Sequence, residues 1–275
     1  MNNMKIGIFW LGTSVYKNYF DNFISTFRNL FPNDEKVLVV LSDGFEELNG
    51  KQYEDGSEII SKKIIDYPYP LVTANKVQMV KTYMEELNLS YAMYVDADTI
   101  CFQKPDEFWE ELKNKICENK LLMTYHPHYL YTPYRNFGEP FIVSNMNSSA
   151  YMSPDYVNNN KCYIMTSFFM GSYDVIAKYA NEIYNMLGKD LANMRWMPVY
   201  PDEAYFNKIY VEESINNIHQ IELNRYITIN PYPYGNFPQY QNNNVWINNF
   251  ENEKNIFLNQ KYDINLKNIK KTNQV

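Results

Sequence analysis

One short stretch of this chain, Tyr91–Ile100, constrains the fold more than any other. Its residues, Tyr-Ala-Met-Tyr-Val-Asp-Ala-Asp-Thr-Ile, form an apolar run that leads directly into two carboxylates. A run of this length, bounded by polar residues, is typical of a buried strand. Because consecutive side chains of a strand point to opposite faces, Asp96 and Asp98 are expected to point the same way. Such a pair is costly to bury unless something positive lies between the two carboxylates.

A divalent cation would meet that requirement. Mn²⁺ and Mg²⁺ are hard cations that prefer oxygen ligands, and such a cation can carry a diphosphate at the same time. The sequence Asp96-Ala97-Asp98 therefore resembles the Asp-X-Asp signature of glycosyltransferases that use nucleotide sugars. The alternative is a solvated turn at the end of a strand, since the Asp-X-Asp pattern is common by chance.

The first hundred residues alternate between strand and helix patterns. Apolar runs predict strands over 5–11 and 37–41 and an edge strand over 59–66, while spacings of three and four predict helices over 16–30 and 74–88. This alternation is typical of a parallel nucleotide-binding sheet, in which ligands bind at the carboxyl ends of the strands. The aspartate pair and Gly12-Thr13-Ser14 both follow such strand ends.

The patterns continue more irregularly after residue 105. They predict a helix over 106–118, a strand over 121–124, a polar excursion over 131–161, an apolar stretch over 162–171, and helices over 173–187 and 202–210. Beyond Asn236 the chain is rich in Asn, Lys and Gln, so we expect this tail to be loosely ordered at best.

Composition excludes several classes of protein. The net charge of −7 argues against a general nucleic-acid binder, which needs a basic face. Cys101, Cys117 and Cys162 have no metal-ligand or redox spacing and suit a reducing compartment, so we expect a cytoplasmic location. No apolar run reaches eighteen residues, which predicts that there is no transmembrane segment, and the apolar run near the N-terminus is too short for a signal peptide.

Five motifs follow one another along the chain. They are Tyr-Val-Asp-Ala-Asp at 94–98, Tyr-His-Pro-His-Tyr at 125–129, Ala-Tyr-Met-Ser-Pro-Asp at 150–155, Tyr-Ile-Met-Thr-Ser-Phe-Phe-Met-Gly at 163–171 and Pro-Asp-Glu-Ala-Tyr-Phe-Asn-Lys at 201–208. In this order they resemble the family 6 glycosyltransferases, the retaining enzymes that include the histo-blood-group A and B transferases and α-1,3-galactosyltransferase. The chain departs from that family at Thr166, Ser167 and Met170, which replace glycines, and at Tyr200 and Pro201. Because no membrane anchor is predicted, the chain is expected to be similar to the bacterial or viral members of this family.

The resemblance implies an α/β fold of the GT-A type, with a mostly parallel twisted sheet flanked by helices. It implies one catalytic domain over 1–240, with a nucleotide-binding half at 1–100 and an acceptor-binding half at 101–240, and a tail over 241–275 that closes over the donor. The implied reaction is retaining α-1,3 transfer of galactose or N-acetylgalactosamine from the UDP-sugar to a β-galactoside-terminated glycan. A lipid-linked acceptor would bring the protein to a membrane surface.

The resemblance also assigns roles to individual residues. Glu203 is the catalytic residue, as nucleophile or as electrostatic stabiliser at the β-face of the anomeric carbon. The UDP-sugar is bound by Tyr16, Lys76, Asp96, Asp98, Met165, Ser167 and Asp202; the glycan acceptor by His126, Tyr200 and Glu203; and Mn²⁺ or Mg²⁺ by Asp96 and Asp98.

Simpler interpretations of these residues stay open. Glu203 can be a first-turn carboxylate that interacts with the helix dipole, Lys76 a solvated helix lysine, Tyr16 a core aromatic and His126 a loop hydrogen-bonder. Two other functions also stay open. One is a different metal-dependent glycosyltransferase of the glycogenin-like kind, and the other is a non-catalytic carbohydrate-binding protein on a transferase frame.

Overall fold

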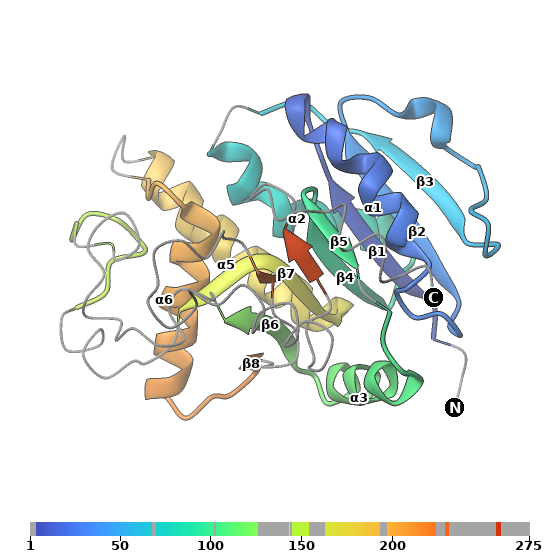
Figure 1. Cartoon of the computed structure of the whole chain (residues 1–275). Helices are drawn as coiled ribbons and strands as arrows, with labels where there is room; N and C mark the ends of the chain where they lie inside the picture. Colours follow the sequence, from blue (N-terminus) through green and yellow to red (C-terminus); the bar gives the residue numbers. More distant parts are fainter. Residues whose placement is uncertain are drawn as a thin grey trace, which may run out of the picture.

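The computed structural model describes residues 4–67, 70–101, 103–125, 143, 145–153, 163–192, 197–223, 229–230 and 257–259. These residues form a seven-stranded sheet with helices packed on both of its faces (Figure 1). A second sheet has three strands in the order β5-β10-β9, which are β5 Thr99–Cys101, β10 Phe257–Asn259 and β9 Ile229–Asn230.

The strand order of the large sheet is β3-β2-β1-β4-β7-β6-β8. The strands are β1 Ile6–Leu11, β2 Lys36–Ser42, β3 Glu58–Lys63, β4 Tyr91–Asp96, β6 Leu121–Tyr125, β7 Ile164–Ser172 and β8 Ile221–Leu223. Six of them run in one direction, and β7 runs antiparallel to its neighbours β4 and β6. This confirms the predicted α/β class with a mostly parallel sheet, and the arrangement is consistent with a Rossmann-like fold.

Alternation along the strands sorts the apolar side chains into two cores. Tyr94 and Val39 face a core shared with α2 Leu71–Glu86, α5 Tyr173–Ala192 and α6 Pro201–Ile215. Met93 and Val40 face a core shared with α1 Phe20–Phe27 and α3 Asp106–Cys117. Strands β1, β2 and β4 are covered on both sides, which explains why their sequences are almost continuously apolar. Two 3₁₀ helices, η1 Ser14–Tyr19 and η2 Glu46–Leu48, complete the first half.

The predicted strand over Tyr91–Ile100 is divided in two. Strand β4 ends at Asp96, Ala97 and Asp98 form a turn, and β5 Thr99–Cys101 begins the small sheet. The indole N–H of Trp10 donates a hydrogen bond to the carbonyl of Ala97 at 3.1 Å, which holds this turn against β1. The alternation that predicted a common direction for Asp96 and Asp98 therefore stops at Asp96.

Other elements begin or end differently from their predicted bounds. The helix predicted over 16–30 is a 3₁₀ helix, η1, followed by the short α1. Ser14, the first residue of η1, has a φ of +50°, which is uncommon for a residue other than glycine. The helix predicted over 202–210 begins at Pro201 and continues to Ile215 as α6.

Strands from both predicted halves share one sheet, because β4 pairs directly with β7. Within the predicted tail, Phe257–Asn259 forms β10, which pairs antiparallel with β5 and parallel with β9 Ile229–Asn230. No helix in the described ranges has the length and apolar character needed to cross a membrane.

Two glycines give a matched test of this packing. At Gly12 an added Cβ would overlap the indole of Trp10, which is fully buried against Phe20. Gly12→Ala should therefore lower the free energy of unfolding by about 1–3 kcal/mol, the usual cost of overpacking. Gly188 lies on the exposed side of α5 with open space around its Cα, so Gly188→Ala should raise stability by about 0.5–1 kcal/mol. Denaturant unfolding of both variants checks this, and a Gly12→Ala protein as stable as the wild type would contradict the close packing.

Candidate active site

Four elements bring functional side chains to the carboxyl edge of the sheet. Asp96 ends β4, and Asp202 and Glu203 lie in the first turn of α6. Lys76 comes from α2, and Thr166 lies near the beginning of β7. Because β7 is antiparallel to β4, its beginning meets the end of β4 at this edge.

Lys76 lies at the centre of this group and is only 3% exposed. Its Nζ is 2.7 Å from Oδ2 of Asp202 and 3.5 Å from Oδ1 of Asp96, and it lies 5.3 Å from the ring centroid of Tyr94. Burial disfavours the charged amine, but the charges of Asp202 and Asp96 and the hydrogen bond to Asp202 outweigh burial and raise the pKa of Lys76. Lys76 is therefore a buried ammonium, which excludes the interpretation as a solvated helix lysine.

The two aspartates nearest Lys76 are each held by a second group. Burial raises the pKa of Asp202, but Lys76 and a hydrogen bond from the hydroxyl of Thr166 outweigh burial, so the pKa is lowered overall. The phenol of Tyr94 donates to Oδ1 of Asp96 at 2.8 Å. Asp202 is thus ionised at neutral pH and aligned by two partners.

Glu203 is partly exposed and behaves differently from Asp202. Burial and the neighbouring charges of Asp202 and Asp96 raise the pKa of Glu203 to about 8, although Lys76 and the hydroxyl of Tyr163 oppose this rise. At neutral pH the Glu203 carboxyl is therefore mainly protonated in the ligand-free site. A carboxyl that holds its proton beside an ionised aspartate is typical of a functional site.

Asn207 fixes the first turns of α6 to β7. Its amide donates to the carbonyls of Glu203 at 2.8 Å and Ile164 at 3.1 Å, and its Oδ1 accepts from the backbone N–H of Ile164 at 2.8 Å. The side chain is completely buried. Sequence reasoning gave Asn207 no role, although an asparagine inside a predicted helix was a usable signal, because its amide competes with backbone hydrogen bonds.

Asp98 lies in the turn after β4 and is only 4% exposed. Burial raises the pKa of the Tyr94 hydroxyl, and the charges of Asp96, Asp202 and Asp98 add to that rise. These three carboxyl groups therefore lie within electrostatic range of the Tyr94 hydroxyl, and Lys76 supplies a positive charge to Asp96 and Asp202.

The carboxyl groups of this site could supply some, but not all, of the ligands of a hard cation. In the described part of the chain, no three His, Cys, Asp or Glu side chains converge closely enough to hold a metal ion. Asp96 and Asp98 could supply the carboxylate oxygens that Mn²⁺ or Mg²⁺ prefers. The other ligands would have to come from water and from a bound molecule such as a diphosphate.

The remaining predicted site residues vary in their surroundings. Tyr16 lies in η1 after β1 and is 37% exposed, so it is not a core aromatic. Met165 is buried in the core on the α1 and α3 side, and Ser167 is buried one residue before Phe168, the first residue of β7 that pairs with β4. Tyr200 is exposed just before α6, and His126 lies outside the described residues.

No protein-family model matches the chain, and no curated protein matches it. The resemblance to family 6 glycosyltransferases therefore stays a prediction from five motifs. Three of these motifs supply Asp96 and Asp202, which both contact Lys76, and Thr166, which donates a hydrogen bond to Asp202. The order of motifs along a sequence does not by itself require that their residues are in contact in the folded protein.

The raised pKa of Glu203 makes stability depend on pH. The folded protein keeps this proton up to about pH 8, whereas the carboxyl of the unfolded chain loses it near the ordinary value of 4.5. Between these values the unfolded state binds fewer protons, so Glu203 lowers the free energy of unfolding as the pH rises, by up to about 1.4 kcal/mol per pH unit. Glu203→Gln has no proton to lose and should escape this decline.

Denaturant unfolding at pH 5, 6.5 and 8 checks this expectation. The stability of Glu203→Gln relative to the wild type should increase steadily with pH, while Glu47→Gln, at an exposed position, should show no such trend. A difference between Glu203→Gln and wild type that is the same at all three pH values would show that Glu203 does not hold its proton.

Proposed function

We propose that this protein is a retaining glycosyltransferase with a GT-A type of α/β fold. It transfers galactose or N-acetylgalactosamine from the UDP-sugar to a β-galactoside-terminated glycan. The observation that carries the proposal is the meeting of Asp96, at the Asp-X-Asp turn, with the Asp202-Glu203 helix start across the buried ammonium of Lys76. The described residues place these groups at the carboxyl ends of parallel strands, where α/β sheets bind their ligands.

The Asp-X-Asp turn is the diphosphate side of the proposed site. Asp96 and Asp98 would hold Mn²⁺ or Mg²⁺, which as a Lewis acid would stabilise the negative charge of the departing UDP. The turn is held by the Trp10 hydrogen bond to Ala97, and Asp96 is aligned by the phenol of Tyr94. Carboxylates held in this way lose little entropy on binding, which favours a defined position for the bound diphosphate.

Glu203 is the residue proposed to act at the anomeric carbon. Positive charge develops there while UDP leaves, and an ionised carboxylate on the opposite face stabilises that charge or forms a covalent bond to the carbon. The positive charge that develops at the anomeric carbon would lower the pKa of a carboxyl group beside it, so the ionised form of Glu203 would be favoured as UDP leaves. Asn207 and Lys76 keep the first turn of α6 in place while this charge changes.

The glycan and the nucleoside would bind on either side of this centre. Tyr16 exposes its ring at the end of β1, where it can stack on a uracil base, as the motif resemblance implies. Tyr200 is exposed directly before α6, three residues before Glu203, and is proposed to contact the glycan acceptor.

The proposal predicts metal-dependent release of UDP. The purified protein, incubated with a panel of UDP-sugars, should release UDP in the presence of Mn²⁺ and lactose, and EDTA should abolish this release. Asp98→Asn should lose most of the activity while the protein stays folded, because the carboxylate is needed for the cation. Full activity in EDTA would contradict the metal site, and binding of lactose without any release of UDP would favour a carbohydrate-binding protein.

A second prediction separates the catalytic role of Glu203 from its place in a helix. Glu203→Gln keeps the size of the side chain but cannot become charged, so UDP-sugar binding should persist while kcat falls. Loss of one electrostatic contribution of this kind costs about 2.7–4 kcal/mol, or roughly a hundred- to a thousandfold in rate. Glu212→Gln, on the same helix and paired with Lys208, is the matched control and should keep kcat. Near wild-type turnover of Glu203→Gln would make Glu203 an ordinary first-turn carboxylate.

A further inference from the structure

A second buried carboxylate lies apart from the groups around Lys76. Asp190, near the end of α5, is 1% exposed. It accepts hydrogen bonds from the backbone N–H of Ser149 at 2.7 Å, the hydroxyl of Ser148 at 3.0 Å and the hydroxyl of Tyr205 at 3.0 Å. A buried carboxylate is costly unless its oxygens are satisfied, and here three neutral donors from two separate segments satisfy them.

The first of these segments, residues 145–153, belongs to the chain between β6 and β7. The end of β6 pairs with the beginning of β7 at Tyr125 and Ile164, so this connection leaves and rejoins the sheet at the edge that carries the site. Within the segment, the hydroxyl of Ser148 also accepts from the N–H of Ala150 at 3.1 Å, and Ala150 and Met152 are buried in the core.

The second segment is α6 itself. Tyr205 lies two residues beyond Glu203, and its ring is fully buried. Asp190 therefore joins the β6–β7 connection to the helix that carries Glu203. The groups on the diphosphate side come from α2, β4 and the turn after β4, and the hydrogen bonds to Asp190 do not involve them.

We propose that Asp190 is a positioning residue that holds segment 145–153 against α6 and so shapes the glycan-acceptor side of the site. This inference rests on the proposed function. Segment 145–153 belongs to the half of the chain, residues 101–240, that the resemblance assigns to acceptor binding, and its contact with Asp190 leaves the Asp-X-Asp turn alone. Loosening this contact should therefore weaken the binding of the glycan acceptor and leave the binding of the UDP-sugar unchanged.

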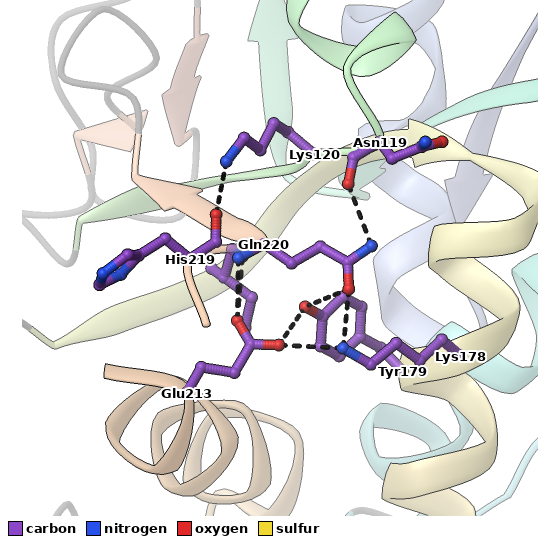
Figure 2. A network of polar contacts seen from close by, with 8 residues as sticks. Asn119, Lys120, Lys178, Tyr179, Glu213, His219 and Gln220 are labelled. Atoms are coloured by element: carbon purple, nitrogen blue, oxygen red, sulfur yellow. Dashed lines mark hydrogen bonds and ion pairs between the residues drawn. The ribbon is translucent and has the colours of Figure 1, made fainter. Parts of the chain in front are cut away.

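The opposite ends of the same two helices provide a matched control (Figure 2). There the phenol of Tyr179, on α5, donates to Glu213, on α6, at 2.6 Å. Glu213 also accepts from the backbone N–H groups of Gln220 at 3.2 Å and Ile221 at 3.1 Å, which fixes the entry to β8. Both ends thus join α5 to α6 by a tyrosine–carboxylate hydrogen bond, but only the Asp190 end includes segment 145–153.

The experiment compares Tyr205→Phe with Tyr179→Phe in the full chain. Each substitution removes one buried hydroxyl and leaves its ring in place, so both proteins should fold. Three quantities are measured with Mn²⁺ present: UDP release without a glycan, the KM for the UDP-sugar and the KM for lactose. Tyr205→Phe should raise the KM for lactose by roughly tenfold, as expected for a misplaced binding segment, and leave the other two quantities within about twofold. Tyr179→Phe should leave all three unchanged.

Hydrogen exchange over residues 145–153 gives a readout that needs no turnover, and it should be faster in Tyr205→Phe than in Tyr179→Phe. An unchanged KM for lactose in Tyr205→Phe would overturn the positioning role. So would an equal decrease in UDP release without a glycan and in transfer to lactose. A wild-type protein that releases no UDP from any UDP-sugar would instead contradict the proposed function, and the acceptor role of Asp190 with it.

Discussion

Lys76 places a buried ammonium 2.7 Å from Asp202 and 3.5 Å from Asp96, and the arrangement of the carboxyl edge depends on that charge. The three residues come from α2, α6 and β4, which are distant in sequence. Removing one partner from a buried ion pair typically costs about 3–5 kcal/mol, because the remaining charge is left uncompensated. The beginning of α6 is therefore bound to the end of β4 by electrostatics as well as by packing. Lys76 keeps Asp202 ionised, whereas burial and the charges of Asp202 and Asp96 keep the proton on Glu203.

The first two turns of α6 connect this centre to the rest of the molecule. Asp202 contacts α2 and β7, Tyr205 reaches Asp190 on α5, and Asn207 is hydrogen-bonded to the backbone of β7. Glu203 lies between these anchors, so its position is set mainly by its neighbours along the helix. Such an arrangement holds the backbone of Glu203 rigidly and leaves its side chain able to respond to a bound molecule.

Most of the fold could be predicted from the sequence because its inner strands β1, β2 and β4 are buried on both faces. Continuous apolar runs such as 37–41 are strong local signals, and strands alternating with helices favour a parallel sheet over other arrangements. The less regular elements were predicted less well. The helix predicted over 16–30 begins as a 3₁₀ helix, and the strand predicted over Tyr91–Ile100 is divided, because β5 pairs with β10 and Trp10 holds the turn between β4 and β5. Those partners are far away in the sequence, so a local pattern contains no information about them.

For the candidate site, the sequence by itself determined which chemical groups are available: Asp96 and Asp98 after an apolar run, and Asp202 and Glu203 at a helix start. Only the tertiary structure decided how these groups affect one another. The burial of Lys76 among them, the amide of Asn207 that fixes α6, and the raised pKa of Glu203 all depend on contacts between separate elements. The physical reason is that the charge state and orientation of a side chain follow from the dielectric and the partners around it, and folding brings those partners together from distant parts of the chain.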